Sequence, residues 1–244
     1  MWGLALFLII LYTIPCMETL GKLFSSDALV KVMRLFLMNK TSPFELTDII
    51  DRCQIRPDSA RTEIKLLESI GFLRHKVFYK DIERPVKKTA HKSKKRQRSE
   101  DVAPKIIRKK CDGFTVNEFF PYIRALQALL IDNESVQKDE LASRFRKTGR
   151  IKLLLVSGVF IQYDDKRLDL LIVGDNLKKK MIDDEVKKLE SELGCELAYA
   201  VFDTEEFKYR LDMYDKLICD VLEYPHEKII SSITIPKEII LGTS

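Results

Sequence analysis

The sequence predicts an α+β protein with two folded units and a helical connector between them. Two observations lead to this prediction. In the N-terminal half, three segments with helical spacing of apolar residues are followed by a strand, whereas in the C-terminal half short apolar runs of strand length alternate with helical segments. A chain of 244 residues with 45% hydrophobic and 32% charged residues is also long enough to bury two cores.

Residues 1–16 form an apolar extension that contains no charged side chain. The run is shorter than the ~18 apolar residues that span a bilayer, and no Lys or Arg precedes it as in a signal peptide, so we do not expect a membrane partner. Three interpretations stay open. The extension is the product of an upstream start, with Met17 as a second start, or a weak membrane anchor or export signal, or a helix packed at an interface.

The cysteines and histidines predict neither a metal site nor a cofactor. Five cysteines are scattered without a C-x-x-C pair, and three dispersed histidines add no metal-ligand spacing. An odd number of scattered cysteines favours a reducing, cytoplasmic compartment.

Three short helices are expected at the start of the N-terminal unit. The first runs from about 27 to 38, and the second begins at Pro43 behind a capping box whose N-cap is Ser42. The third begins near Pro57 and ends at Gly71. The expected inward-facing residues are Leu29, Val32, Met33, Leu35, Phe36 and Leu37 in the first helix and Ala60, Ile64, Leu67 and Ile70 in the third.

A strand from Phe72 to Tyr79 and a return strand from Ile106 to Phe114 are expected next. Residues 84–110 carry twelve Lys or Arg against two acids, a net charge of +10, whereas the rest of the chain carries −5. We expect this basic block to form a long loop between the two strands. Such a block attracts polyanions, so nucleic acid is the expected partner, and a solvated basic loop without a partner is the alternative.

The stretch ELTDIIDRCQIRPDSARTEIKLLESIGFL resembles the helix-turn-helix of winged-helix transcriptional regulators, and residues 17–116 follow that element order with a long basic wing insertion over 84–110. The resemblance implies that the third helix enters the major groove of double-stranded DNA, with Arg61 placed to read guanine, while the wing contacts phosphates. Asp58 would repel a phosphate, and a role only in protein contact or dimerisation stays open. The residues assigned to DNA are Ser59, Arg61, Thr62, Lys65, Arg74, Lys76, Lys94, Lys95, Arg96 and Arg98.

Residues 117–149 are expected to form a helical connector, and residues 150–228 an α/β unit. The connector holds one helix that ends near Ile131 and another over about 135–148. Residues 229–244 form a tail that is either an added strand or a partner-binding arm. The expected inward-facing residues of the connector are Leu126, Leu129 and Leu130.

The α/β unit is expected to contain three strands and two helices. Its elements, in order, are strands over 151–156 and 168–173, a helix over 178–193 that Gly194 closes, a strand over 196–202 and a single helix over 203–223. The expected inward-facing residues of the first of these helices are Met181, Ile182, Val186, Leu189 and Leu193.

Residues 150–224 resemble the minimal nucleotidyltransferase domain, which has the polymerase-beta-like fold. The likeness rests on the strand LLIVGD, the loop before it and the Asp-x-Glu-Glu-Phe start of the last helix. The family's active pattern is Gly-Ser, a loop, Asp-x-Asp and a later third acid, and in that family the acids hold divalent metals. The corresponding residues here are Ser157 and Gly158 in inverted order, then Arg167-Leu168-Asp169, with Ala198 near the third position.

The resemblance therefore implies a site that has lost its chemistry and keeps only vestiges of the motif. Because strand side chains alternate, Arg167 and Asp169 are expected on one face, where the guanidinium repels a divalent ion. Two roles stay open for Arg167, either an ion pair with Asp169 or the holding of a nucleotide phosphate without metal. Asp164 and Asp165 are expected to form a polar turn.

We expect a DNA-binding transcriptional regulator without enzymatic activity, homodimeric, whose second unit serves dimerisation or senses a nucleotide or protein ligand. Two alternatives stay open: an active nucleotidyltransferase that modifies a protein, RNA or small molecule, and an antitoxin-like module that acts only by protein interaction. The identity of residue 167 separates the first two, because a metal site of this kind needs at least two acids on one strand face.

Overall fold

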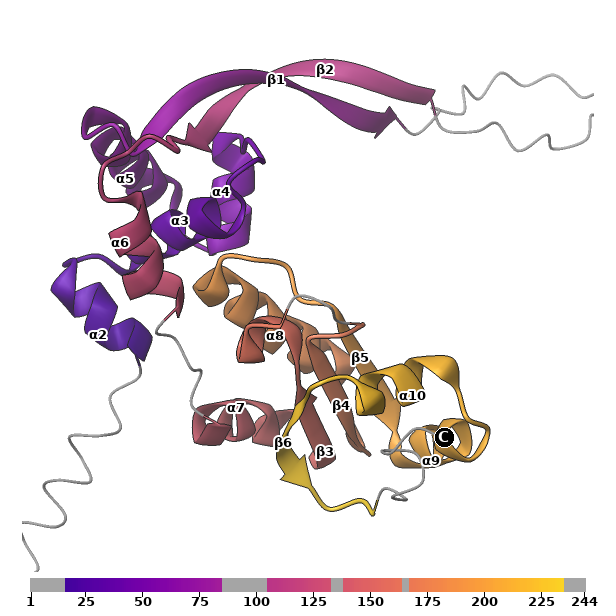
Figure 1. The fold of residues 1–244 in the computed structure, drawn as a ribbon. Helices are drawn as coiled ribbons and strands as arrows, with labels where there is room; N and C mark the ends of the chain where they lie inside the picture. Colours follow the sequence, from indigo (N-terminus) through magenta and orange to yellow (C-terminus); the bar gives the residue numbers. More distant parts are fainter. Residues whose placement is uncertain (1–15, 85–104, 133–137, 164–166, 235–244) are drawn as a thin grey trace, which may run out of the picture.

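The computed structural model describes residues 16–84, 105–132, 138–163 and 167–234 of the chain. Within these ranges the protein is mixed α and β, with a two-stranded ribbon and a separate four-stranded sheet (Figure 1). The apolar residues 1–15 lie outside the described residues. No helix in the described ranges is long and apolar enough to cross a membrane.

Four helices form the N-terminal unit: α2 (Cys16–Leu23), α3 (Asp27–Met38), α4 (Leu46–Cys53) and α5 (Pro57–Ser69). The predicted bounds of α3 are confirmed, because Ser26 caps the helix by accepting the N–H of Leu29 at 3.1 Å. The inward-facing residues predicted for α3 are all buried. Ile70 was predicted to face inward and is instead 54% exposed, because α5 ends before it and the buried position passes to Phe72.

The start predicted for the second helix is wrong by three residues. Helix α4 begins at Leu46, and Glu45 and Asp48 form its capping box. The preceding Phe44 is extended and forms an isolated β-bridge with Phe114. Phe44 is buried and packs edge-on against Phe36 with ring centroids 5.7 Å apart, so the segment before α4 runs along the ribbon and does not join the helix.

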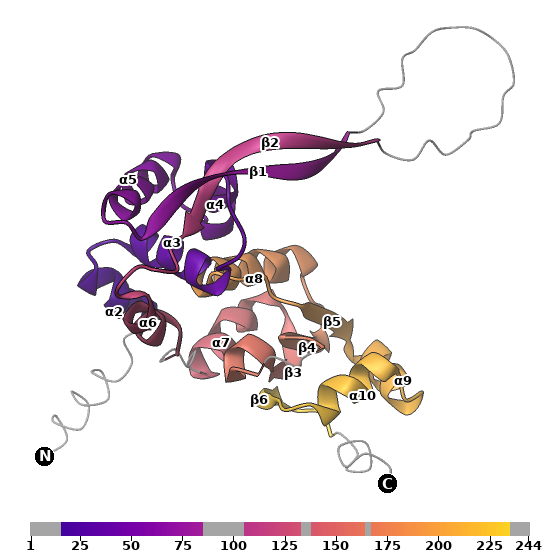
Figure 2. The same cartoon turned by 45° about the horizontal axis from the view of Figure 1, so that its top comes forward.

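The ribbon consists of β1 (Leu73–Arg84) and β2 (Lys105–Val116), which pair antiparallel from Leu73↔Val116 to Arg84↔Lys105. Both strands are longer than predicted. Five cationic residues of the predicted basic block therefore lie in paired strands, namely Arg84, Lys105, Arg108, Lys109 and Lys110. Residues 85–104, including Lys94, Lys95, Arg96 and Arg98, lie outside the described residues. In Figure 2 the ribbon projects away from the helices.

The connector contains helix α6 (Ile123–Gln127), which continues as a π-helical turn over Ala128–Asp132, and helix α7 (Lys138–Phe145). Leu130 is fully buried as predicted, whereas Leu129 is 39% exposed. The prediction for Leu129 fails because the π-helical turn changes the angular spacing of the side chains on which that prediction depended.

The C-terminal sheet has the order β5-β4-β3-β6, with bounds Tyr199–Asp203, Leu170–Asp175, Arg150–Val156 and Glu227–Ser231. Strands β4 and β5 run parallel, whereas β3 is antiparallel to both of its neighbours. The tail therefore supplies an added strand over Glu227–Ser231, one of the two alternatives expected, and residues 235–244 lie outside the described residues.

Helices cover both faces of this sheet. Helix α8 (Lys179–Leu193) and α7 pack on one face, and α9 (Thr204–Asp212) and α10 (Lys216–Glu223) on the other. The alternation along β3 and β4 separates the faces: Leu154, Val156, Leu170 and Ile172 point toward α8, and Leu153, Leu155, Leu171 and Val173 toward α9.

Two predictions for these helices are wrong. The single helix expected over 203–223 is two helices. The break lies at Tyr214, which has a positive φ of 53°. Asp215 is the N-cap of α10, and its side chain accepts a hydrogen bond from the amide of Leu217 at 3.0 Å. Met181 was expected inward and is 37% exposed, since it lies beside rather than on the buried stripe of α8. The closure of α8 by Gly194 is confirmed, with φ 79° at that residue.

The two units are joined through α3 and the end of α8. The fully buried Arg34 donates from Nε to the carbonyl oxygen of Leu130 at 3.0 Å and from Nη1 to that of Glu192 at 2.9 Å. Asn39 donates to the carbonyl oxygen of Gly194 at 2.8 Å. The bonds to Glu192 and Gly194 satisfy backbone carbonyls at the end of α8, so the helical unit and the sheet unit meet through defined polar contacts.

Candidate functional site

Helices α4 and α5 meet through a tight turn. Gln54 adopts a left-handed conformation with φ 50°, and Pro57 occupies the first position of α5, where its missing N–H costs nothing. Cys53, at the end of α4, is 1% exposed, and burial raises the pKa of its thiol to about 12. The thiol is therefore protonated and inert at neutral pH, and its role is to pack the turn.

Helix α5 presents a polar face to solvent. Arg61, Thr62 and Lys65 are exposed, and Ser59 is half-buried. The Arg61 guanidinium lies 3.2 Å from the Asp58 carboxylate, with both side chains more than half exposed, so this ion pair is worth no more than about 1 kcal/mol and opens readily. The residues of α5 include two cations and three acids, which give the helix a net charge of −1.

The ribbon supplies the positive charge that α5 lacks. Residues 73–116 contain fifteen Lys or Arg and five Asp or Glu, a net charge of +10. Arg74 and Lys76 are exposed near its base and, together with Lys40 and Thr41, line a cleft of about 340 Å³. Further along, Lys109 and Lys110 are exposed.

One ion pair links the ribbon to α4. Lys80 Nζ donates to Asp48 Oδ1 at 2.8 Å, and this hydrogen bond raises the pKa of Lys80 above its ordinary value. Since Asp48 belongs to the capping box of α4, one carboxylate holds both the start of the helix and the side of the ribbon.

An exposed aromatic side chain stands beside the basic cleft. Phe119 is 83% exposed, and the guanidinium of Arg74 lies 5.9 Å from the centre of its ring. The exposure of Phe119 was not predicted from the sequence, because a Phe-Phe pair does not show by itself which of its rings is buried. Only Phe120 packs inward, edge-on against Phe72 at 5.5 Å.

In the sheet unit, the prediction that Arg167 and Asp169 share a face of one strand is wrong. Strand β4 begins only at Leu170, so strand alternation does not apply to residue 167. Arg167 makes an ion pair with Asp220 of α10, with Nε and Oδ2 2.8 Å apart. An acid on a helix fifty residues away is a partner that local spacing does not reveal.

Asp169 has a structural role. It is 1% exposed, and its Oδ1 accepts the N–H of Val159 at 3.0 Å while its Oδ2 accepts the N–H of Ala198 at 2.9 Å. The carboxylate thereby joins the turn after β3 to the segment before β5. Both oxygens already accept backbone hydrogen bonds, so they are poorly placed to bind a metal ion.

Ser157 and Gly158, the neighbouring residues of the sequence motif, also have structural roles. Ser157 is buried, and its hydroxyl donates to the carbonyl oxygen of Pro225 at 2.6 Å, while Gly158 begins a short 3₁₀ turn. Asp164 and Asp165 lie outside the described residues. Within the described ranges, no group of three or more His, Cys, Asp or Glu residues is placed to hold a metal ion.

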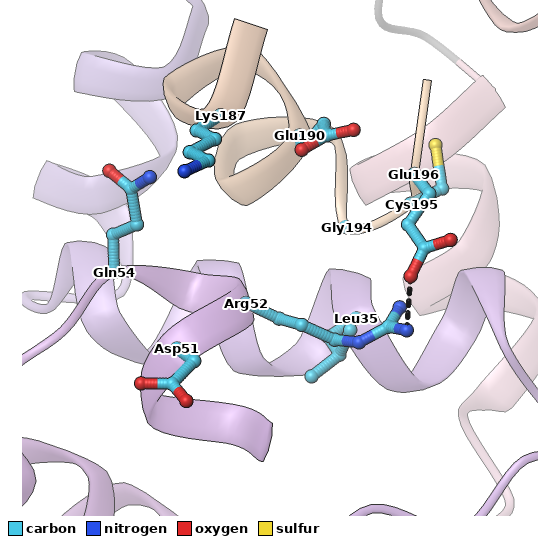
Figure 3. A pocket seen from close by; sticks show the side chains of 9 residues that line it. All are labelled: Leu35, Asp51, Arg52, Gln54, Lys187, Glu190, Gly194, Cys195 and Glu196. Carbon is cyan, nitrogen blue, oxygen red and sulfur yellow. Dashed lines mark hydrogen bonds and ion pairs between the residues drawn. The ribbon is translucent and has the colours of Figure 1, made fainter. Parts of the chain in front are cut away.

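A cleft of about 300 Å³ lies between helices α3 and α4 on one side and the end of α8 on the other (Figure 3). Arg52 reaches across it to an ion pair with Glu196, and Lys187 and Gln54 point toward one another at the other end. This cleft could not be predicted from local sequence patterns, because its two sides are more than 130 residues apart in the chain.

Comparisons with known proteins returned nothing: no model of a protein family, no curated protein and no solved structure matches this chain.

Proposed function

We propose that the protein is a DNA-binding transcriptional regulator in which α5 enters the major groove and the basic ribbon lies along the phosphate backbone. The observation that carries this proposal is the division of charge between the two elements. Residues 73–116 have a net charge of +10, of which the two paired strands carry +5, whereas α5 has −1, so affinity would come from this basic segment and selectivity from the exposed polar side chains of α5.

The order of elements supports a winged-helix arrangement. Helices α3, α4 and α5 are followed by the ribbon, and the extended Phe44 before α4 pairs with Phe114 of β2. In such proteins the second helix of the helix-turn-helix reads bases and the wing contacts the backbone. Lys80 and Asp48 hold the ribbon on the side of α4, which leaves the outer face of α5 exposed.

We propose that the sheet unit is a nucleotidyltransferase-like domain without catalytic activity, which serves dimerisation or ligand sensing. Asp169 supports this proposal because its two oxygens accept backbone amides, and Arg167 supports it because a guanidinium occupies an acid's position. A homodimer would present two copies of α5 and therefore bind paired half-sites about one helical turn apart.

The proposal is tested by selecting duplexes from a randomised library with the full-length chain and then measuring affinities of variants for the selected sequence. Arg61→Ala should lose about 1–3 kcal/mol on the selected duplex and little on a scrambled one, because it removes a base contact. Lys76→Ala should weaken binding to both duplexes equally, because a phosphate contact carries no sequence information.

The matched control is Lys180→Ala, which removes an exposed lysine from α8 in the other unit and should change neither affinity. Recovery of no duplex from the library, or equal losses for Arg61→Ala on selected and scrambled duplexes, would contradict the assignment of α5 as the reading element.

A further inference from the structure

A second basic site lies in the sheet unit, at the end of the sheet opposite Ser157 and Asp169. Arg150 begins β3 there, Thr204 begins α9, and the residues just after β6 close the third side. Together they surround a pocket of about 450 Å³, a volume within the usual range for small-molecule sites. The lining residues are Arg150, Ile151, Lys152, Thr204, Lys208, Ser232, Ile233 and Thr234.

The lining of this pocket has one sign of charge. Arg150, Lys152 and Lys208 are cations from two different elements, and none of the described residues that line the pocket is acidic. The hydroxyl side chains of Ser232 and Thr234 complete the polar wall, whereas the hydroxyl of Thr204 donates to Asp175. Convergent cations and hydroxyl donors are the groups that bind the oxygens of a compact anion.

One carboxylate behind the pocket positions one of the cations. Asp175 Oδ2 lies 2.7 Å from Lys152 Nζ, and Asp175 Oδ1 accepts the hydroxyl of Thr204 at 2.5 Å. The hydrogen bond from Lys152 lowers the pKa of Asp175 below its ordinary value of 3.8, so this acid is ionised at neutral pH. With Asp175 counted against the three cations, the site retains a net charge of +2.

The backbone also fixes the walls of the pocket. The amide of Ser232 donates to the carbonyl oxygen of Lys152 at 2.7 Å, which holds the segment after β6 against β3. A Cβ on Gly174 would come within 2.3 Å of the carbonyl oxygen of Arg150, so β4 approaches the start of β3 closely. Arg150 and Lys152 are therefore presented from the paired start of β3, where the register with β4 shifts between Ile151 and Leu153.

We propose that this pocket binds a phosphate-bearing small molecule, with Arg150, Lys152 and Lys208 contacting the phosphate oxygens. Cations that converge on a concave volume fit a compact anion, whereas a nucleic-acid backbone would require a row of cations along an extended surface. The isoleucines Ile151 and Ile233 add apolar surface beside the anion site, which suits an organic phosphate. This inference rests on the sheet unit alone and does not depend on the proposed DNA binding.

The test is isothermal titration calorimetry of the full-length chain with sodium pyrophosphate and with adenosine monophosphate, at constant ionic strength. We expect saturable binding of at least one of them with a dissociation constant below about 1 mM. Lys208→Met and Arg150→Met should each weaken it about tenfold, the loss expected for one charge-assisted contact. Tighter binding of the nucleotide would identify an organic phosphate, and tighter binding of pyrophosphate an inorganic one.

Lys180→Met is the matched control, because it removes an exposed lysine from α8, which covers the opposite face of the sheet, and it should bind as the unaltered chain does. Circular dichroism of each variant checks that the fold is kept. No saturable binding of either ligand, or an equal loss in Lys180→Met, would overturn the proposal. A loss of duplex affinity in Lys208→Met would also overturn it, by making the pocket part of a nucleic-acid surface.

Discussion

Gly194 lies directly against the backbone of Arg34. A Cβ at position 194 would come within 2.6 Å of the carbonyl carbon of Arg34 and within 2.6 Å of the amide nitrogen of Leu35. The end of α8 in the sheet unit therefore touches the middle of α3 in the helical unit with no room for a side chain. This contact packs the unit proposed to bind DNA directly against the unit proposed to bind a ligand.

Gly194→Ala should destabilise the protein more than an alanine at another left-handed glycine. Gly71 has φ 80°, nearly the 79° of Gly194, but an added Cβ there would meet nothing within 4 Å. We expect Gly71→Ala to lower the free energy of unfolding by about 1 kcal/mol and Gly194→Ala by about 3 kcal/mol, measured by urea denaturation. Equal losses would show that the approach of α8 to α3 contributes nothing to stability.

Arg34→Met should loosen the two units from each other. The methionine keeps much of the buried volume but leaves the carbonyl groups of Leu130 and Glu192 without their donor, a cost of roughly 2–4 kcal/mol. We expect a lower unfolding midpoint and separate transitions for the two units in calorimetry. Lys31→Met is the control. It removes a hydrogen bond from Lys31 of α3 to Ser191 of α8 and should lower the free energy of unfolding by less than about 1 kcal/mol. A single transition at the unaltered temperature would contradict the role given to Arg34.

Asp169→Asn should reduce stability. The carboxylate accepts hydrogen bonds from two backbone N–H groups. In asparagine the NH₂ group would face one of these donors, so one hydrogen bond would be lost and the free energy of unfolding would fall by about 1–3 kcal/mol. Asp184→Asn changes an exposed residue of α8 and should stay within about 0.5 kcal/mol of the unaltered protein. A magnesium-dependent transfer of nucleotide that Asp169→Asn abolishes without loss of stability would instead favour an active nucleotidyltransferase.

Tyr199 should titrate above the ordinary pKa of a tyrosine side chain. Its hydroxyl donates to Asp183 at 2.8 Å, and this bond raises its pKa from 10.0 to about 12. Because the folded pKa is the higher one, the stabilisation is present below pH 10 and is lost as the pH rises through about 12. Ultraviolet difference titration should show a component near pH 12 that Tyr199→Phe removes and the exposed control Tyr209→Phe leaves. Identical titrations for the two variants would contradict this assignment.

The amphipathic helices were predictable because each carries a strong local pattern. Helix α3 has a cap at Ser26 and an apolar surface, and α8 has an apolar stripe that Gly194 ends. Phe44 was not predictable, since a strand of one residue has no period of two to detect. Its bridge to Phe114 depends on a residue seventy positions away.

The polar contacts escaped prediction for a related reason. Arg34 stands among apolar residues of α3, a signal that it is buried, but its acceptors belong to distant segments of the chain. One of the two roles expected for Arg167 was an ion pair with Asp169, two residues away, whereas its ion pair is with Asp220. Local spacing predicts which side chains are buried or exposed, whereas the identity of a polar partner depends on tertiary packing.

The salt dependence of duplex binding tests the proposed function most directly. Each phosphate that the protein neutralises contributes about −0.9 to the slope of log affinity against log salt concentration, so the intact chain should give a slope steeper than about −4. Replacing residues 87–103, which contain seven Lys or Arg, by a short neutral linker should make the slope shallower by at least about 2. A slope near zero for the intact chain, or one that the replacement leaves unchanged, would contradict the account of a basic ribbon on DNA.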